Sequence, residues 1–548
     1  MSGIAAIIHF DGRPVAPGDI DRMTASMAYR GPDGIRHLQG GPVALGHCRL
    51  CTTTESLEEV QPVASASGKV WLVLDGWLDN WVELRADLLR LGATLRNRSD
   101  AELVLAAYEQ WGEDCVLHIE GDFALVVWDE RRQAVFCARD RMGNKPLNYF
   151  WSGNSLVIAS EVRAILALPW VPRDLNEGLL AERMAGEWWS RSETLWKGLT
   201  RLVAAHRMTV TSTGIRMDRY WTPDLDTVIR YKSDEEYFQH YRELFLDRVR
   251  RSARSHRPVA YDVSGGLDSS AIFCVARHLQ DKRQLPAPEI RGYTMDFSGD
   301  PRADEIEYVR AVARFLKTDI AETAPSDMPL PWYVANSLES GEQAPYPNSV
   351  MMYGVRQAAV RAGSRVVIVG NGGDEWQDGS RAYYAEELAA GRLRNLFGCL
   401  GFDLRSIGPA ATLHAFLRHG IFPLLPQAVQ ESMRGIVRKV ARRYVPDADW
   451  LAAGTASLAR SRRSLRPSIP AARTVPQRQM LELLYQEVVR DWFREVDERQ
   501  NARLGLEGRR PMDTPALLQF ALSTPERLRM RGDRSKFMHV SALRRLVP

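Results

Sequence analysis

The chain has 548 residues, of which 45% are hydrophobic and 26% charged, and its formal net charge is +4. This length predicts two or three domains with cores of their own, and so small a net charge gives no reason to expect a nucleic-acid partner. The first residues show no basic stretch before an apolar run, and no run of 18 apolar residues occurs. We therefore expect a cytoplasmic protein with no membrane segment.

Short apolar runs broken by Gly, Pro, Asp and Asn fill the chain from residue 1 to about 220, a pattern typical of strands joined by turns. The runs are IAAIIHF, VALGHCRL, VWLVLDGWL, FALVVWD, AVFCARD and SLVIAS. Two helical stretches, over residues 82–91 and 101–111, interrupt them. We expect a layered α+β domain rich in strands over residues 1–220.

Alternating strands and helices characterise the remainder, residues 221–548. A polar connector leads to a helix expected over 234–254; strands are expected at 258–262, 290–297 and 365–370, with helices after 271 and over 304–316. Such alternation predicts an α/β domain with a doubly wound parallel sheet. Residues 385–476 are helical in pattern and rich in arginine, which solvated helix faces explain and which a cleft for a peptide would also use.

A run of small polar residues follows the strand expected at 258–262. It consists of Ser264, Gly265, Gly266, Leu267, Asp268, Ser269 and Ser270. Its glycines let backbone N–H groups approach an anion, and the helix that follows adds free amides and a positive dipole end. Its serines supply hydroxyl donors, and Asp268 is placed to hold a divalent cation against phosphate oxygens. The run predicts a phosphate-binding loop, with an ordinary capped turn as the alternative.

A second glycine turn follows the strand expected at 365–370. It consists of Gly370, Asn371, Gly372, Gly373, Asp374 and Glu375. Because the carboxyl ends of parallel strands meet at one edge, Asp374 should lie near Asp268, and the two could share a Mg²⁺ bound to ATP phosphates. A capping aspartate is the simpler alternative. Met295, at the end of the strand 290–297, is a candidate to contact adenine, or else a buried strand methionine.

These two runs resemble signatures of the asparagine synthetase and β-lactam synthetase superfamily, whose ATP-pyrophosphatase-type domain adenylates a carboxylate. The resemblance implies ATP and Mg²⁺ as cofactors, Asp268 and Asp374 as metal ligands, and the turn at Gly370, Gly372 and Gly373 as part of the ATP site. Residues 501–513 and 532–536 resemble the closing segment of the same family, which implies a catalytic Lys536 beside Asp374 and Glu375. A compact ammonium on a flexible stem suits that role.

Motifs across the first domain resemble the glutaminase of asparagine-synthetase-type amidotransferases, an Ntn-type sandwich. They lie at residues 2–5, 30–34, 46–50, 61–62, 99–100, 121–124 and 138–141. In that family a cysteine exposed by removal of Met1 attacks glutamine, and an asparagine helps to form the oxyanion hole. This chain has Ser2 at the nucleophile position and Asp75 at the oxyanion position. A carboxylate would repel the oxyanion, so we expect an inactive glutaminase-like domain.

With no working glutaminase, the amine must arrive with the substrate or from solution. Asn371 occupies a position where asparagine synthetases usually have glutamate and β-lactam synthetases a tyrosine of a base dyad, and it cannot accept a proton. An α-amino group, with a pKa of roughly 7.7 to 8.0, needs less help from a base.

Together these features most resemble the lasso peptide cyclase. That resemblance implies that an Asp or Glu side chain of a leader-cleaved precursor peptide is activated as an AMP ester and attacked by the peptide's N-terminal amine. It also implies two partners, the precursor peptide and a leader peptidase. Three alternatives stay open: a β-lactam-synthetase-like enzyme that closes a small ring, an ammonia-dependent asparagine synthetase, and a silent ATP-site scaffold.

Overall fold

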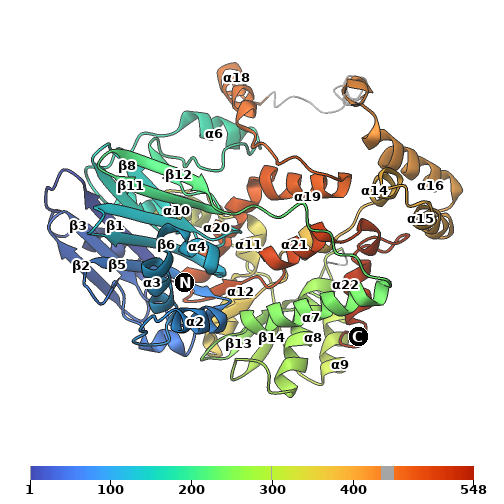
Figure 1. Cartoon of the computed structure of the whole chain (residues 1–548), viewed down its shortest axis with the longest axis horizontal. Helices are drawn as coiled ribbons and strands as arrows, with labels where there is room; N and C mark the ends of the chain where they lie inside the picture. Colours follow the sequence, from blue (N-terminus) through green and yellow to red (C-terminus); the bar gives the residue numbers. More distant parts are fainter. Residues whose placement is uncertain (1, 298, 301, 427, 434–449) are drawn as a thin grey trace.

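Two antiparallel sheets pack face to face in the first part of the chain (Figure 1). The computed structural model describes residues 2–297, 299–300, 302–426, 428–433 and 450–548. Met1, whose removal the resemblance invokes, and residues 434–449 of the arginine-rich run lie outside these ranges.

Each of the two sheets has six strands. The first has the order β10-β8-β9-β1-β3-β2 and the second the order β12-β11-β7-β6-β5-β4. The strands of the first are β1 (Gly3–His9), β2 (Ile35–Gly40), β3 (Val43–Cys48), β8 (Asn148–Trp151), β9 (Ser155–Ala159) and β10 (Leu199–Arg201). Those of the second are β4 (Val63–Ala64), β5 (Val70–Leu78), β6 (Gly121–Asp129), β7 (Ala134–Arg139), β11 (His206–Thr211) and β12 (Gly214–Arg219).

Helices cover the outer face of both sheets, so the domain has four layers. Ile4 and Ile8 of β1 point between the sheets, whereas Ile7 packs outward against Ile20 of a helix. This alternation is the period of two that a strand imposes, and burial on both faces explains the continuous apolar runs of the sequence. The covering helices are α1 (Asp19–Ser26) and α5 (Val162–Leu166) on one side and α2 (Trp81–Arg90) and α3 (Asp100–Trp111) on the other. The layered α+β prediction is confirmed.

A five-stranded parallel sheet forms the centre of the second part. Its order is β15-β14-β13-β16-β17, and each neighbouring pair is parallel. The strands are β13 (Val259–Asp262), β14 (Ile290–Met295), β15 (Ile320–Thr323), β16 (Val366–Ile368) and β17 (Glu507–Arg509). Helices lie on both faces, namely α7 (Asp234–Ser252), α8 (Leu267–Asp281), α9 (Ile306–Leu316) and α22 (Phe537–Leu543) on one and α12 (Tyr353–Arg361) on the other. This is the doubly wound arrangement that the sequence predicted.

Further helices connect and extend these layers. They are α4 (Cys115–His118), α6 (Glu177–Met184), α10 (Leu330–Ser340), α11 (Pro347–Met351), α13 (Gly373–Gln377), α14 (Tyr383–Ala389), α15 (Leu393–Ser406), α16 (Pro409–Phe416), α18 (Ala453–Ser461), α19 (Val475–Gln486), α20 (Val489–Arg503) and α21 (Pro515–Ser523). Figure 1 shows α14, α15 and α16 grouped at the edge away from the strand sandwich. Within the described ranges, none of the helices has the length and apolar character needed to cross a bilayer.

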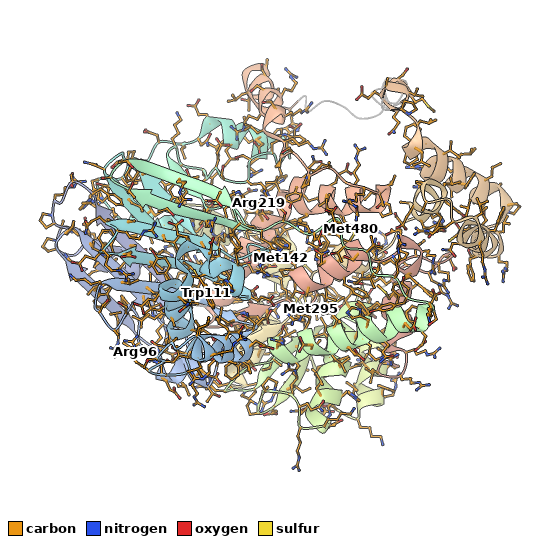
Figure 2. All side chains as sticks on the ribbon, in the orientation of Figure 1. Arg96, Trp111, Met142, Arg219, Met295 and Met480 are labelled. Atoms are coloured by element: carbon orange, nitrogen blue, oxygen red, sulfur yellow. The ribbon has the colours of Figure 1, made fainter. Side chains whose placement is uncertain are left out.

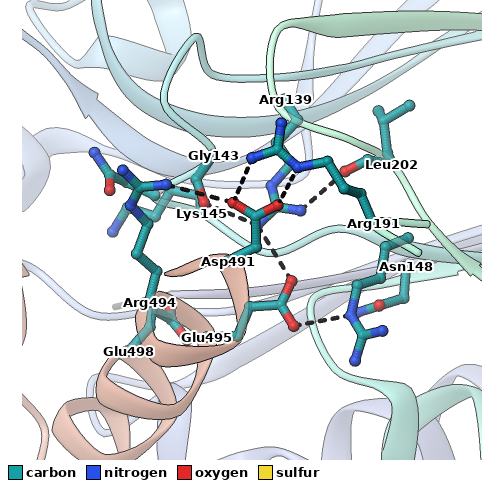
Figure 3. Close-up of polar contacts among 12 residues, drawn as sticks. Arg139, Gly143, Lys145, Asn148, Arg191, Leu202, Asp491, Arg494, Glu495 and Glu498 are labelled. Carbon is teal, nitrogen blue, oxygen red and sulfur yellow. Dashed lines mark hydrogen bonds and ion pairs between the residues drawn. The ribbon is translucent and has the colours of Figure 1, made fainter. Parts of the chain in front are cut away.

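The two parts share a buried junction. Met142 of the first packs with Met480, Trp376 and Leu518 of the second, and Figure 2 marks both methionines. Buried ion pairs also cross the junction, and several of the residues involved are drawn in Figure 3. The crossing pairs are Arg30–Glu498, Lys145–Glu507, Arg139–Glu495, Arg201–Glu495, Arg191–Asp491 and Arg254–Asp100.

Candidate functional site

The loop between β13 and α8 is shaped to receive an anion. Gly265 has φ +85°, and a Cβ there would lie 2.9 Å from the Glu305 carbonyl oxygen, so only glycine fits. The backbone N–H of Ser264 and the Ser264 hydroxyl both contact Oγ of Ser269, at 3.0 and 2.9 Å, which fixes the turn. The helix begins without a side-chain cap at Gly266, so its first amides are available to a ligand.

The second glycine turn packs directly against this loop. A Cβ at Gly373 would lie 2.1 Å from the carboxylate of Asp268, and one at Gly370 would lie 3.1 Å from the Ser269 amide nitrogen. Gly372 has φ +99°, with the backbone of Met512 and Asp513 only 2.4 to 2.5 Å from a Cβ built there. Because these glycines have no side chains, three segments that are far apart in the sequence can meet: the phosphate loop, the second glycine turn and residues 512–513.

Lys536 lies between the two aspartates that the sequence singled out. Its Nζ donates to Oδ2 of Asp268 and to Oδ1 of Asp374, each at 2.5 Å. Burial opposes charge on Lys536, but the hydrogen bonds to these two carboxylates raise its pKa above the ordinary value. Burial raises the pKa of Asp268, and Lys536 counteracts that rise. Asp268, Asp374 and Lys536 thus form one charged cluster at the carboxyl edge of the sheet.

The remaining predicted residue of the turn, Glu375, has another contact set. Its Oε2 accepts from the backbone N–H of Gly372 at 2.8 Å, and its Oε1 lies 3.3 Å from Arg490. It thus caps α13 while it pairs with α20.

The sequence reasoning missed His539, one turn after Lys536. Its Nε2 lies 3.9 Å from Oδ1 of Asp268, its Nδ1 hydrogen-bonds the Tyr241 hydroxyl at 2.7 Å, and burial, with the charge of Lys536, lowers its pKa to about 4. The available signal in the sequence was a histidine three positions after Lys536.

Two cavities, one beside each glycine turn, share Asp262 and Met352 as a common wall. The first, of about 120 Å³, lies beside the phosphate loop and is lined by Ser264, Met295 and Phe297 among others. Met295, which Figure 2 marks, thus lines a cavity beside the phosphate loop, and its contact with adenine stays a prediction. The second, of about 190 Å³, is lined by Asn371 and by residues of α11, α12 and α20.

The donor set fits a hard divalent cation. Asp268 and Asp374 already converge on one cation, the Lys536 ammonium, and Oδ1 of Asp268 and Oγ of Ser270 are buried with no hydrogen-bond partner among the described residues. No group of three or more His, Cys, Asp or Glu side chains suited to a metal occurs in the described ranges. Two carboxylates completed by phosphate oxygens and water are the arrangement typical of Mg²⁺.

The predicted inactive positions of the first domain meet around a buried arginine. Nη1 of Arg30 donates to the Ser2 carbonyl at 3.3 Å and lies 3.9 Å from Oδ2 of Asp75. Asp75 has no exposed surface, and neither of its carboxylate oxygens has a hydrogen bond within the described chain. Burial raises its pKa to about 6, against the opposing charge of Lys145, 3.7 Å away. The Ser2 hydroxyl accepts from the Leu50 amide at 3.2 Å.

Comparisons with known proteins agree with this division. Residues 1–221 match the family model described as a glutamine amidotransferase domain, and residues 240–548 match the one described as asparagine synthase. A glutamine-hydrolysing asparagine synthetase of Bacillus subtilis is 33% identical over 301 residues, which are 54% of this chain and 48% of the relative. An amidase of Gibberella zeae is 30% identical over 427 residues, 71% of this chain and 61% of the relative. The chain thus spans about half to three-fifths of these two relatives.

Among solved structures, the glutamine phosphoribosylpyrophosphate amidotransferase of Bacillus subtilis complexed with ADP and GMP aligns with 58% of this chain and 90% of its own, at 14% identity and a TM-score of 0.32.

Proposed function

Because this chain belongs to the asparagine synthase family, we propose that it is an ATP-dependent amide ligase that closes a peptide macrolactam, as lasso peptide cyclases do. In the first step an Asp or Glu side-chain carboxylate of a leader-cleaved precursor peptide attacks the α-phosphate of ATP, and pyrophosphate leaves. In the second step the peptide's own N-terminal amine attacks the acyl-adenylate carbonyl, and AMP leaves.

The observation that carries the proposal is Asp75. A buried carboxylate at the position of an oxyanion donor opposes the negative charge that glutamine hydrolysis must develop. Glutamine is therefore not the source of the amine, and a substrate that brings its own amine supplies it. A tethered amine also gains from proximity, which can contribute roughly 7 to 11 kcal/mol toward the barrier.

The phosphate loop and the charged cluster have different roles in adenylation. Backbone amides and serine hydroxyls of the loop at 264–270 bind phosphate oxygens, and Lys536 stabilises the negative charge that shifts from carboxylate to pyrophosphate. Mg²⁺, held by Asp268 and Asp374, would neutralise phosphate charge. Met295 and Phe297 line a cavity of a size and apolar character that suit a base.

Mass spectrometry of a leader-free candidate peptide, incubated with the protein and Mg·ATP, tests the proposal. We expect the peptide to lose one water, with AMP released and no requirement for glutamine, and Lys536→Ala to abolish both. Repeating the reaction with and without a leader peptidase would establish whether that partner is needed. No AMP with any carboxylate substrate would instead identify a silent ATP-site scaffold.

An ammonia-dependent asparagine synthetase is the second candidate, because a relative at 33% identity carries the name of an asparagine synthetase. It would release AMP with aspartate and ammonium salts and none with the peptide. AMP release with a small β-amino acid derivative alone would point to the β-lactam-synthetase-like alternative.

A further inference from the structure

The second cavity contains a carboxylate that adenylation does not use. Asp497, on α20, lines this cavity together with Asn371, and its side chain keeps 24% of its surface exposed. The Tyr346 hydroxyl donates to its Oδ1 at 2.6 Å, and Arg510 lies 3.8 Å from its Oδ2. One oxygen is thus fixed by a neutral donor, while the other has, among the residues that the structure describes, a long ion pair with Arg510.

The other carboxylates around the reacting centre are engaged. Asp262, the second acid of this cavity, forms a bidentate ion pair with Arg356, one bond being 2.5 Å and the other 2.7 Å. Asp268 and Asp374 hold Lys536, as described above. Glu375 caps α13. Asp497 is the acid of this cavity that remains available to a cationic or hydrogen-bond-donating ligand.

An unpartnered amide marks the same cavity as a site for a ligand. Gln500 is 6% exposed and lines the cavity, and its Nε2 has no hydrogen-bond partner within the described residues. Leaving a buried donor without a partner is unfavourable, and a ligand carbonyl would supply the missing acceptor. The cavity therefore offers a carboxylate for an amine and a donor for a carbonyl oxygen, which are the two groups that must meet in amide formation.

We propose that Asp497 binds the attacking amine and accepts its proton, in the role that Asn371 cannot fill. The inference rests on the proposed function, for whichever amine is used. As the amine nitrogen bonds to the acyl-adenylate carbonyl carbon, the bond from that carbon to the AMP oxygen breaks. The nitrogen's excess proton passes to the Asp497 carboxylate and then to solvent, and the electron pair of the broken bond leaves with AMP.

Tyr346 is a positioning residue in this scheme. Burial, and then the charge of Asp497, raises its pKa, so it stays a neutral donor that holds the carboxylate. The Tyr346 hydroxyl thereby fixes the orientation of the Asp497 carboxylate in the cavity. The titratable groups that line the cavity are Asp262, Tyr346, Tyr353, Arg356, Asp497 and Arg510.

The test separates the two half-reactions in the full-length protein. ATP–pyrophosphate exchange with a leader-free peptide reports adenylation, and hydroxylamine, a nucleophile that is uncharged at neutral pH, traps the acyl-adenylate as a hydroxamate. We expect Asp497→Asn to leave exchange and hydroxamate formation unchanged while peptide amide formation falls by about 10²-fold or more. Asp497→Glu should recover part of the rate.

The difference between the two half-reactions tests the role of Tyr346. Tyr346→Phe should slow peptide amide formation and leave exchange and hydroxamate formation unchanged, because Asp497 loses the hydroxyl that fixes its Oδ1. The matched control is Glu482→Gln, which removes a carboxylate paired with Arg478 on α19, away from the cavity; it should change none of these rates.

Two results would overturn the assignment. Equal losses of exchange, hydroxamate and amide in Asp497→Asn would show a structural or substrate-binding role, and an unchanged amide rate would show no role. If the wild-type protein showed no carboxylate-dependent exchange with peptide or amino acid, the proposed function would fail and the proton transfer with it.

Discussion

Replacing Gly373 with alanine should disable the phosphate site without unfolding the protein. A Cβ at this position would lie 2.1 Å from Cγ and Oδ2 of Asp268, whereas ordinary contact begins at 3.4 Å. The carboxylate must retreat by about 1.3 Å, which breaks its 2.5 Å hydrogen bond with Lys536. Because misplacing a reacting group by about 1 Å can cost about 10²-fold, we expect ATP–pyrophosphate exchange to fall by about that factor.

The matched control is Gly454→Ala, since a Cβ built at Gly454 in α18 meets no atom within 4 Å. It should exchange like the wild-type protein. Thermal denaturation of both variants checks that each is folded. The hypothesis is that Asp268 and the second glycine turn bind the same nucleotide. It would be refuted if Gly373→Ala bound Mg·ATP and catalysed ATP–pyrophosphate exchange at the wild-type rate.

The remaining predictions concern buried charge. Glu498→Ala should lower the free energy of unfolding by about 1.5 to 3 kcal/mol, because the buried Arg30 loses its bidentate partner and keeps only Glu161 as a carboxylate within 3 Å among the described residues. The exposed pair broken by Glu482→Gln should cost at most about 1 kcal/mol, and equal losses in denaturant titrations would contradict this. Burial raises the folded-state pKa of Asp75 to about 6 from 3.8, so stability gained by its protonation is present below 3.8 and is lost as pH rises through 6. Asp75→Asn should therefore stabilise the protein by up to about 3 kcal/mol near pH 7.5 and not near pH 4, and a loss of stability at both would refute the sign.

Local rules made the two glycine turns predictable. Gly265 and Gly372 have φ of +85° and +99°, so the sequence must place glycine there. The long buried strands could also be predicted from the sequence, because their side chains are apolar on both faces. By contrast, β2 was missed because its residues are mostly exposed and polar. β17 was missed because Glu507 and Arg509 are charged; they pair with each other and also with Lys145 and the Arg254 carbonyl, which are distant in the sequence.

The second cavity could not be predicted from the sequence, because the residues that line it are distant from one another in the chain. Tyr346 and Asp497 are 151 residues apart, and neither belongs to a motif. Their contact exists because α11 packs against α20, and residues of both helices line the cavity together with Val369, which follows β16. Only the folded chain reveals that a carboxylate faces the position of Asn371.

The junction between the two domains gives the first domain a structural role. Glu507 of β17 pairs with Lys145 of the first domain, whose charge and that of Arg509 hold the Glu507 pKa well below its usual range despite burial. The next residues of this strand and turn, Gly508 and Arg510, line the second cavity. Without the first domain, Glu507 would keep Arg509 but lose Lys145, and Glu498 would lose Arg30. The first domain therefore helps to hold one wall of the second cavity in place, independently of any glutamine hydrolysis.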